Sequence, residues 1–510
     1  MQSLFFDTRV LDAAARERFG LTEELMMENA AAALERAVVQ QVALTADGNH
    51  AQSVVVLCGS GNNGADGYAL ARRLCGLVVA GETPITPVVI AAADPASDLC
   101  KRQAERAQKC GVPLLSVQTD ISIDKNNTII QALSHADIIV DCIFGSGFHG
   151  DLAEPVATLC ARANDTQAMR LACDVPTGVR ADGTVAERAF CADCTVTMGA
   201  LKLSLYSDAA KDVTGQVVCA DLGISRALFE KDSPAAATLL DAEDLVLPHR
   251  HKQLVNKGSF GHVAVASGEK MGASCIAGQA ALRFGAGLVS LVRLGEPFAK
   301  ADLPQVTPEL MTASDFPQNT TAIALGMGLG RESKKIQPYF DWLSAHTDIP
   351  CVLDADVFFA DGLQDFLRTH TGGTVLTPHP KECMMLLQQC GLGNYTISDC
   401  VHNRPALIEQ FCRAFAGVVL LVKGANPMIG VFDGAAFQLF VNPLGKNCLA
   451  KAGSGDVLAG LIAALLAQGQ TPIDAAKNAS LAHALASRSC KNDFALTPLT
   501  LIDAVANLAD

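Results

Sequence analysis

The stretch "GSGNNGADG" (Gly59–Gly67) follows the apolar run "VVVLC" (Val54–Cys58). An apolar run before a glycine-rich turn indicates a buried strand that leads into a helix. The glycines of the turn spell G-x-G-x-x-G, a pattern that lets the backbone approach a pyrophosphate. A lone motif of this kind is weak, because a tight strand-to-helix turn with Asp66 as the helix cap explains it equally well. The stretch therefore predicts an α/β unit and leaves its ligand open.

Apolar strands and helical segments continue to alternate after this turn, through "ITPVVIAAA", "ADIIVDCIFG" and "RLACDVPTG". This alternation predicts a parallel sheet with helices on both faces. It restarts with six further strand-like runs, from "GHVAVASG" (261–268) to "GVVLLVKG" (417–424). The segment Arg226–Leu245 between the two series has no strand signal and contains Pro234, so we expect it to be a linker. The chain of 510 residues should form two α/β domains, residues 1–225 and 240–510.

Composition restricts the class of protein. Half of the residues are hydrophobic and 18% are charged, as in a well-filled globular chain. The net charge of −14 argues against a nucleic-acid partner. The segment "MQSLFFDTRV" does not resemble a secretory signal, and "VLAGLIAALLAQG" (457–469) is too short to span a bilayer and predicts a buried helix. We therefore expect a cytoplasmic protein with no membrane partner.

The 18 cysteines are scattered along the chain, many of them in strand-like runs. In a cytoplasmic protein we expect them to be reduced and to pack in the core. One C-x-x-C pair, Cys191 and Cys194, has no second pair nearby, so packing is favoured over zinc binding.

Two more loops follow predicted strands: "DCIFGSGFHGD" (Asp141–Asp151) and "DVPTG" (Asp174–Gly178). Ligands of open α/β sheets bind beyond the carboxyl ends of the strands. Asn63, Asp141 and Thr177 would bring amide, carboxylate and hydroxyl oxygens to one rim. Oxygen ligands without histidine or cysteine suit a hard cation rather than zinc.

Together with "LMMENAA" (Leu25–Ala31), these loops resemble the NAD(P)H-hydrate epimerase family (YjeF N-terminal family) over about the first 225 residues. The resemblance implies a Rossmann-like sandwich and potassium held by Asn63, Asp141 and Thr177. The implied substrate is hydrated NADH or NADPH (NADHX or NADPHX), whose hydroxyl at ring carbon C6 is switched between R and S forms. Proton transfer would fall to Asp66 and Asp174, with Lys202 holding phosphate or assisting the acid. The implied substrate contacts are Asn62, Asn63, Gly64, Ala65 and Asp66, then Gly145, Ser146, Gly147, Phe148, His149, Gly150 and Asp151, and Asp174. Ala65 and Thr177 depart mildly from the commoner glycine and serine.

A second glycine turn opens the apolar segment "AGSGDVLAGLIAALLA" (Ala452–Ala467). Backbone N–H groups of such a turn form an anion hole at a helix start, and Asp456 could take the proton from an attacking hydroxyl. An N-capped core helix is the alternative. Asp354 and Asp356 alternate on a predicted strand, so we expect them to face one side, where they could reach magnesium through water.

With "NKGSFGHV" (256–263), "GMGLG" (326–330), "LTPHPKE" (376–382) and "LVKGANPMI" (421–429), this motif resembles the ribokinase-like superfamily, and within it the ADP/ATP-dependent NAD(P)H-hydrate dehydratases. The resemblance implies that ADP or ATP, with magnesium, phosphorylates the C6 hydroxyl and that phosphate is then eliminated. Phe358, Lys381 and Pro427 depart from the commoner Asn, Gly and Thr, and Pro427 removes a hydroxyl and an N–H from the nucleotide loop. The implied substrate contacts are Ala273, Gly328, His379 and Asp456, the nucleotide contacts are Lys423, Gly424, Ala425, Asn426, Pro427 and Gly455, and Asp456 is the base.

The combined hypothesis is cofactor repair by a homo-oligomeric enzyme that binds only small molecules. A kinase of a small alcohol or vitamin precursor would share the G-x-G-D turn. A dehydrogenase fits poorly, because Asp94 lies about thirty residues after the glycine turn where about twenty are expected. A non-catalytic binding scaffold is the third alternative.

Overall fold

The computed structural model describes residues 1–45, 52–80, 85–117, 123, 127–302 and 306–509. The chain forms two compact units, Ser3–Ala236 and Ala237–Asp510, the second of which includes Met1–Gln2. The seven-stranded sheet lies entirely in the N-terminal unit, and each unit has its own hydrophobic clusters. The predicted α/β class with two domains is confirmed.

The N-terminal unit is built on a seven-stranded parallel sheet of order β4-β3-β2-β5-β6-β7-β9. Its strands are β2 (Gln52–Cys58), β3 (Ile85–Ala91), β4 (Leu114–Ser116), β5 (Ile138–Cys142), β6 (Met169–Cys173), β7 (Cys194–Met198) and β9 (Gln216–Ala220), and β1 (Gln2–Phe5) pairs with β8 (Leu201–Lys202) beside them. The helices are α1 (Arg9–Phe19), α2 (Glu23–Thr45), α3 (Asn62–Ala80), α4 (Asp98–Lys109), α5 (Asn127–Ser134), α6 (Val156–Asn164), α7 (Lys211–Thr214) and α8 (Arg226–Phe229).

Helices cover both faces of this sheet because successive strand residues point to opposite sides. In β2, Val54 and Val56 pack under α2, α3 and α4, whereas Val55 and Leu57 pack under α5 and α6. Both sets are fully buried, which is why the strand is continuously apolar. Cys194 packs in the first of these clusters, in agreement with the core role expected for the C-x-x-C pair.

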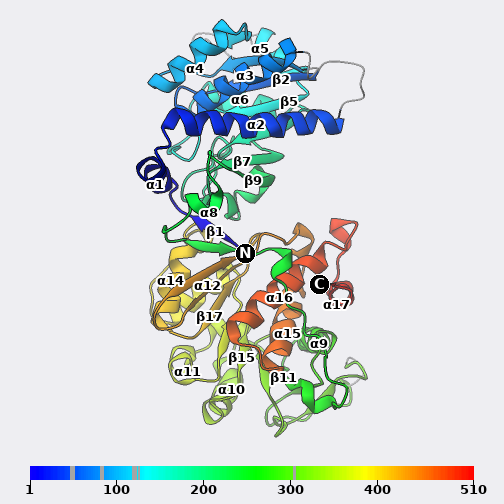
Figure 1. Ribbon diagram of the computed structural model, residues 1–510. Helices are drawn as coiled ribbons and strands as arrows, with labels where there is room; N and C mark the ends of the chain where they lie inside the picture. Colours follow the sequence, from blue (N-terminus) through cyan, green and yellow to red (C-terminus); the bar gives the residue numbers. More distant parts are fainter. Residues whose placement is uncertain (46–51, 81–84, 118–122, 124–126, 303–305, 510) are drawn as a thin grey trace. The chain divides into compact units, whose positions relative to one another are not determined.

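The C-terminal unit contains the strand order β13-β12-β11-β14-β15-β16-β17-β18-β19-β10, parallel except where β18 runs against β17 and β19. In Figure 1 its helices form a layer on each face, with α10, α11, α12 and α14 on one and α9, α15, α16 and α17 on the other. The strands are β10 (Ala237–Leu239), β11 (His262–Ala266), β12 (Leu288–Val292), β13 (Met311–Ala313), β14 (Ala322–Leu325), β15 (Cys351–Leu353), β16 (Thr374–Leu376), β17 (Val419–Val422), β18 (Met428–Phe432) and β19 (Phe437–Val441). The helices are α9 (Met271–Arg283), α10 (Ser333–Ala345), α11 (Leu363–Thr369), α12 (Pro380–Gln389), α13 (Ile397–His402), α14 (Arg404–Ala414), α15 (Ser454–Ala467), α16 (Pro472–Ser487) and α17 (Pro498–Val505), with a 3-10 helix η6 (Ala355–Phe359) after β15.

The predicted buried helix is α15, in which every residue is buried except Gly455 and Asp456. A helix that is apolar all round must lie inside a core, so the two partly exposed positions mark its one accessible end. Within the residues that the structure describes, no helix is long and apolar enough to cross a membrane.

Three interpretations of helix and strand positions from the sequence are wrong. The linker Arg226–Leu245 contains strand β10, which pairs in parallel with β19. A strand of three residues is too short to show an alternating pattern. Asp66 does not cap α3, because that helix already begins at Asn62. Asp456 likewise does not cap α15, whose N-cap is Gly453.

Candidate active sites

A cavity of about 820 Å³ in the N-terminal unit lies at the carboxyl ends of β2, β5 and β6, within the size range of small-molecule sites. Three loops that the sequence singled out converge on it, together with residues of α1, α2 and α4. The predicted substrate residues that line it are Asn62, Asn63, Asp66, Gly145, Ser146, Gly147, Phe148, His149, Asp151 and Asp174.

The other predicted contacts of this group do not line the cavity. Ala65 is a residue of α3 and is fully buried in the core. Gly64 serves the turn itself, because a Cβ atom there would lie 1.9 Å from the carbonyl oxygen of Gly59. Gly150 has φ of +77° and adjoins the lining residues without being one of them. The glycine pattern thus permits a close strand-to-helix approach, which is a packing requirement.

Asp174 is held in a strained and fully bonded position at the end of β6. Its φ is +70°, a left-handed conformation that non-glycine residues adopt mainly at functional sites. The backbone N–H of Ser146 donates to Asp174 Oδ2 at 3.0 Å, and Lys202 Nζ lies 2.6 Å from Oδ1. Burial raises the pKa of Asp174, but Lys202 and the backbone N–H donors outweigh it and lower the pKa below its usual value. Asp174 is therefore ionised near neutral pH.

Lys202 is buried behind Asp174 and does not line the cavity. Its ammonium also donates to Thr197 Oγ1 at 2.9 Å. The structure therefore brings Lys202 to Asp174 and gives it no direct position for a substrate phosphate.

Asp66 lies in the first turns of α3 and contributes to the same cavity. Burial, and then the negative charge of Asp174, raise its pKa well above the ordinary value. The pKa values of two carboxyl groups in one cavity are thus shifted in opposite directions, that of Asp66 upward and that of Asp174 downward. Such a division is what acid–base chemistry at neutral pH requires.

Asp141 and Thr177, two of the predicted cation ligands, are bonded to each other. The Thr177 hydroxyl donates to Asp141 Oδ1 at 2.8 Å and its N–H donates to Oδ2 at 2.7 Å. Asp141 is fully buried, and burial raises its pKa to about 6. Asn63, the third predicted ligand, turns its Oδ1 toward Gly145, where a Cβ atom would lie 3.2 Å away.

The donor set fits a monovalent cation. Asn63 Nδ2 is buried and has no hydrogen-bond partner among the described residues, which is costly for a polar group. Exchanging the amide oxygen and nitrogen would place an acceptor there. A cation would satisfy that oxygen and offset the buried charge of Asp141.

In the C-terminal unit, Lys423 follows β17, and its ammonium lies beside the start of α15. Lys423 Nζ is 2.8 Å from Asp354 Oδ1 and 3.8 Å from Glu382 Oε2. A Cβ atom at Gly455 would lie only 3.2 Å from the same nitrogen, so glycine leaves room for the ammonium. Burial, and then the charge of Asp354, raise the pKa of Asp456 to about 7. A lysine cation, a glycine turn and a titratable aspartate therefore meet at one helix N-terminus.

The expectation that Asp354 and Asp356 alternate on one strand is wrong. Asp354 directly follows β15 and pairs with Lys423. Asp356 lies in η6, where it accepts the N–H of Gly330 at 3.0 Å and pairs with Arg331 at 3.2 Å. Ala355 between them has φ of +52°, so the strand has ended and the two-residue alternation no longer holds.

The remaining predicted contacts are distributed over neighbouring loops. Gly328 and Ala273 are adjacent, since a Cβ atom at Gly328 would lie 3.2 Å from that of Ala273. His379 caps α12, with Nδ1 accepting the N–H of Lys381 at 3.1 Å.

In the expected nucleotide loop, Gly424 and Ala425 are exposed, whereas Asn426 is buried. The carbonyl of Asn426 accepts a bond from Arg404, and that of Pro427 accepts the N–H of Asn442. The second half of this loop is therefore anchored to the protein, while its first half faces solvent beside Lys423.

Comparisons with known proteins agree with this division of the chain. Residues 23–204 match the family model described as YjeF-related protein N-terminus, and residues 263–507 match that described as NAD(P)H-hydrate dehydratase. A bifunctional NAD(P)H-hydrate repair enzyme of Helicobacter pylori is 41% identical over 508 residues, which cover 100% of both chains. The chain belongs to this family of bifunctional NAD(P)H-hydrate repair enzymes.

Other relatives with the same description are more distant. The enzyme of Moorella thermoacetica is 30% identical over 93% of this chain and 90% of its own. Among solved structures, the ADP/ATP-dependent NAD(P)H-hydrate dehydratase of Bacillus subtilis, co-crystallised with ATP and Mg²⁺, matches 53% of this chain and 97% of its own, with 23% identity and a TM-score of 0.44.

Two acidic residues at these family sites were missed by sequence reasoning. Asp12 of α1 lines the N-terminal cavity, and burial is the main cause that raises its pKa to about 6. No local signal predicts this, because α1 reaches the cavity by long-range packing. Glu382 lies beside Lys423 and also accepts the N–H of His379 at 2.9 Å. The spacing His379-x-x-Glu382 at a helix start is a capping pattern that could have identified it.

Proposed function

We propose that this protein repairs hydrated NADH and NADPH. The N-terminal unit interconverts the R and S hydrates, and the C-terminal unit dehydrates the S form at the expense of ADP or ATP, releasing AMP or ADP and phosphate. Family membership over the whole chain supports the pairing of the two activities. The observation that carries the proposal is the placement of acidic groups with shifted pKa values near glycine turns. In one unit the pKa of Asp66 is raised and that of Asp174 is lowered, and in the other the pKa of Asp456, beside Lys423, is raised.

Epimerisation at C6 requires the hydroxyl to leave one face of the ring and water to return on the other. Protonated Asp66 can donate a proton to the departing hydroxyl, while the lone pair of the ring nitrogen forms a double bond to C6. Water then adds to the opposite face as the double bond reverts, and ionised Asp174 can take its proton. Lys202 keeps Asp174 in the ionised form that this step needs.

We propose that Asn63, Asp141 and Thr177 hold potassium. Its chemistry would be electrostatic, since it offsets the buried charge of Asp141. Because Phe144 N–H donates to Thr177 Oγ1 at 3.0 Å, an ordered Thr177 also orders the start of the loop that carries Gly145 and Ser146. That loop supplies the N–H that binds Asp174.

Dehydration would begin with attack of the C6 hydroxyl oxygen on the terminal phosphorus of the nucleotide. The bond from that phosphorus to its bridging oxygen breaks, and the hydroxyl proton passes to Asp456. The C6–O bond then breaks with its electron pair leaving on phosphate, and the C5 proton passes to that departing phosphate as the C5–C6 double bond forms. The N–H groups at the start of α15 and the ammonium of Lys423 face the charge that develops on phosphate.

Magnesium fits as an ion carried by the nucleotide. Within the described residues, no group of three or more histidine, cysteine or acidic side chains is arranged as a metal site. Magnesium usually keeps several waters and binds substrate phosphates with one or two carboxylates. Asp354 and Glu382, beside Lys423, are the carboxylates that its waters would meet.

A kinase of a small alcohol or vitamin precursor would share the α15 turn, but the match of the whole chain to bifunctional repair enzymes favours repair over this alternative. The two are distinguished by their products: the repair enzyme releases inorganic phosphate from ADP or ATP only with hydrated cofactor, whereas a kinase accumulates a phosphorylated product. We also propose a homo-oligomer, which light scattering of the full chain would test.

A further inference from the structure

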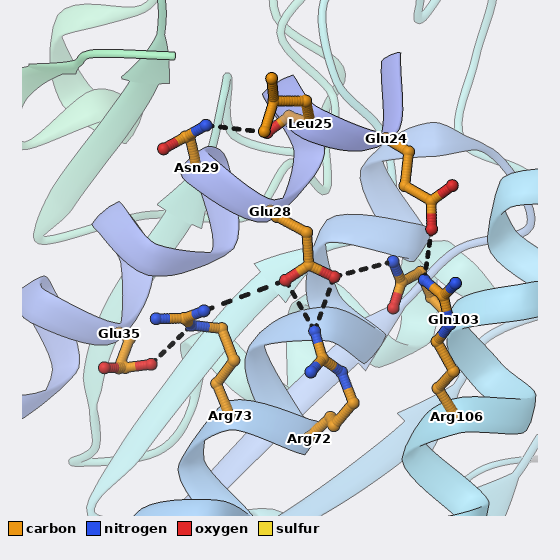
Figure 2. Close-up of polar contacts among 9 residues, drawn as sticks. All are labelled: Glu24, Leu25, Glu28, Asn29, Glu35, Arg72, Arg73, Gln103 and Arg106. Atoms are coloured by element: carbon orange, nitrogen blue, oxygen red, sulfur yellow. Dashed lines mark hydrogen bonds and ion pairs between the residues drawn. The ribbon is translucent and has the colours of Figure 1, made fainter. Parts of the chain in front are cut away.

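The segment Leu25–Ala31 supports the family assignment, but the proposed chemistry uses none of its side chains. On α2, Met26, Met27 and Ala30 line the N-terminal cavity. Glu28 lies between them in sequence and does not line it. Its carboxylate extends instead toward α3 and α4, as Figure 2 shows.

A single carboxylate connects three helices at this point. Arg72 Nη2 of α3 donates to both oxygens of Glu28, at 2.7 Å each. Gln103 Nε2 of α4, which is fully buried, donates to Oε1 at 3.2 Å. Arg73 of α3 adds a longer contact of 3.9 Å to Oε2. The side chains of Glu28 and Arg72 are 30% and 25% exposed, so bulk water only partly screens this pair.

Each of these helices supplies a wall of the cavity. Helix α2 contributes Met26 and Met27, α3 contributes Asn62, Asn63 and Asp66, and α4 contributes Leu99. We propose that Glu28 is a positioning residue for epimerisation, which sets Asp66 and the neighbouring asparagines against Asp174 by joining α2, α3 and α4 through Arg72 and Gln103. This inference rests on the proposed epimerase function.

The charge of Glu28 also reaches the proposed acid. The groups that act on Asp66 come from several elements: Asp174 and Cys173 at the end of β6, Asp12 of α1 and Glu28 of α2, and Lys202 compensates Asp174. Burial and the charge of Asp174 are the largest causes that raise the pKa of Asp66, and the charge of Glu28 adds to them. Removing the charge of Glu28 should therefore lower that pKa, whereas loss of an ordinary structural contact should not.

The same helix offers a matched control. Glu35 of α2 pairs with Arg73 of α3 at 2.6 Å and is 19% exposed, so it is at least as buried as Glu28. The polar contacts described for it involve α3 alone, and it is not among the groups that act on Asp66. Figure 2 shows the two glutamates side by side on α2.

The test uses the full chain as wild type, Glu28→Gln, Glu35→Gln and Arg72→Met. R-to-S exchange is measured for kcat, KM and pH dependence, and dehydration of the S hydrate reports on the other unit of the same molecule. Glu28→Gln should lower the kcat of exchange by about tenfold or more, with a small change in KM, since small misplacements of acid–base groups cost this much. Its activity should also fall at a lower pH on the alkaline side, because Asp66 loses its proton sooner. Dehydration should be unchanged.

Glu35→Gln should match wild type in both kcat and pH profile. If Glu28→Gln and Glu35→Gln behave alike in exchange, the inference is overturned. If Glu28→Gln does not fold, the Arg72→Met variant tests the inference instead. It removes the bonds between Arg72 and Glu28 but leaves the charge of Glu28 in place. The kcat of exchange should therefore fall, while the pH at which activity declines on the alkaline side should not move downward. Normal exchange by Arg72→Met would overturn the inference, and absence of exchange by wild type would instead overturn the proposed epimerase function on which it rests.

Discussion

Lys202 and Asp174 form a buried ion pair in which Nζ and Oδ1 lie 2.6 Å apart, with Lys202 only 3% exposed. Asp174 adopts a left-handed backbone to reach this position. The pair links the short strand β8 to the end of β6, and so connects the acid–base group to a residue 28 positions away in the chain. A carboxylate that is buried, bonded and ionised at a cavity wall is poised to accept a proton.

Replacing Lys202 with methionine should abolish epimerisation. The change leaves Asp174 buried without its cation, so its pKa should rise and it should become protonated. Breaking a buried pair by removing one partner typically costs about 3–5 kcal/mol of unfolding free energy, which urea denaturation would measure. Retained exchange at neutral pH in a folded variant would contradict the role given to this pair.

The same ion pair predicts how stability varies with pH. The pKa of Asp174 is lowered in the folded state, so its stabilisation is complete above the unfolded value near 3.8 and is lost as pH falls through the lower folded value. Urea titrations from pH 6 downward should show this loss in wild type, whereas in Lys202→Met, in which the folded pKa of Asp174 is raised, protonation of this group should instead add stability as pH falls. Parallel curves for the two proteins would contradict the assigned ionisation.

Potassium should stabilise the N-terminal unit. A ligand that binds only the folded state raises stability with its concentration, so the melting temperature should be higher in potassium chloride than in choline chloride at equal ionic strength. Thr177→Val removes the hydroxyl that bonds Asp141 and should abolish the difference. Equal melting temperatures of wild type in the two salts would argue against a cation at Asn63, Asp141 and Thr177.

The two units should fold separately when the chain is cut at the right place. We propose a boundary at residue 236, because Phe229 of α8 is buried in a cluster with Leu11, Met26 and Leu222. A fragment of residues 1–236 should be folded and epimerise without dehydrating, whereas a fragment ending at 225 should be less stable. Aggregation of the longer fragment, or exchange lost from it, would show that the units depend on each other.

Dehydration should depend on Asp456 and rise with pH. The base must be ionised, and burial with the charge of Asp354 raises its pKa to about 7, so kcat should fall as pH drops below about 7. Asp456→Asn should lower dehydration by roughly 10²–10⁴-fold and leave epimerisation intact. The helix start should survive, since Gly453 and not Asp456 caps it.

The positions of the loops followed from the sequence because parallel strands deliver their carboxyl ends to one edge. Asn63, Asp141 and Asp174 were therefore found from strand-like runs and glycine turns alone. Contacts between residues that the fold brings together from distant parts of the chain could not be predicted in this way. The pairing of Lys202 with Asp174 and the reach of Glu28 to Arg72 arise from tertiary packing, which has no local pattern.

Local backbone changes account for the other differences. The left-handed Ala355 ends the strand alternation between Asp354 and Asp356, and no residue type in this stretch predicts that conformation. Strand β10 has three residues, too few for a periodic signal, and is recognisable only by its pairing with β19.

One measurement tests the repair function most directly. A mixture of R and S hydrates is incubated with ADP or ATP, and the absorbance of the reduced nicotinamide is followed together with phosphate release. Wild type should convert both epimers completely, Lys202→Met should convert the S fraction and then stop, and Asp456→Asn should show almost no conversion. Recovery of a stable phosphorylated product without reduced nicotinamide, or conversion of both epimers by Asp456→Asn at the wild-type rate, would contradict the account.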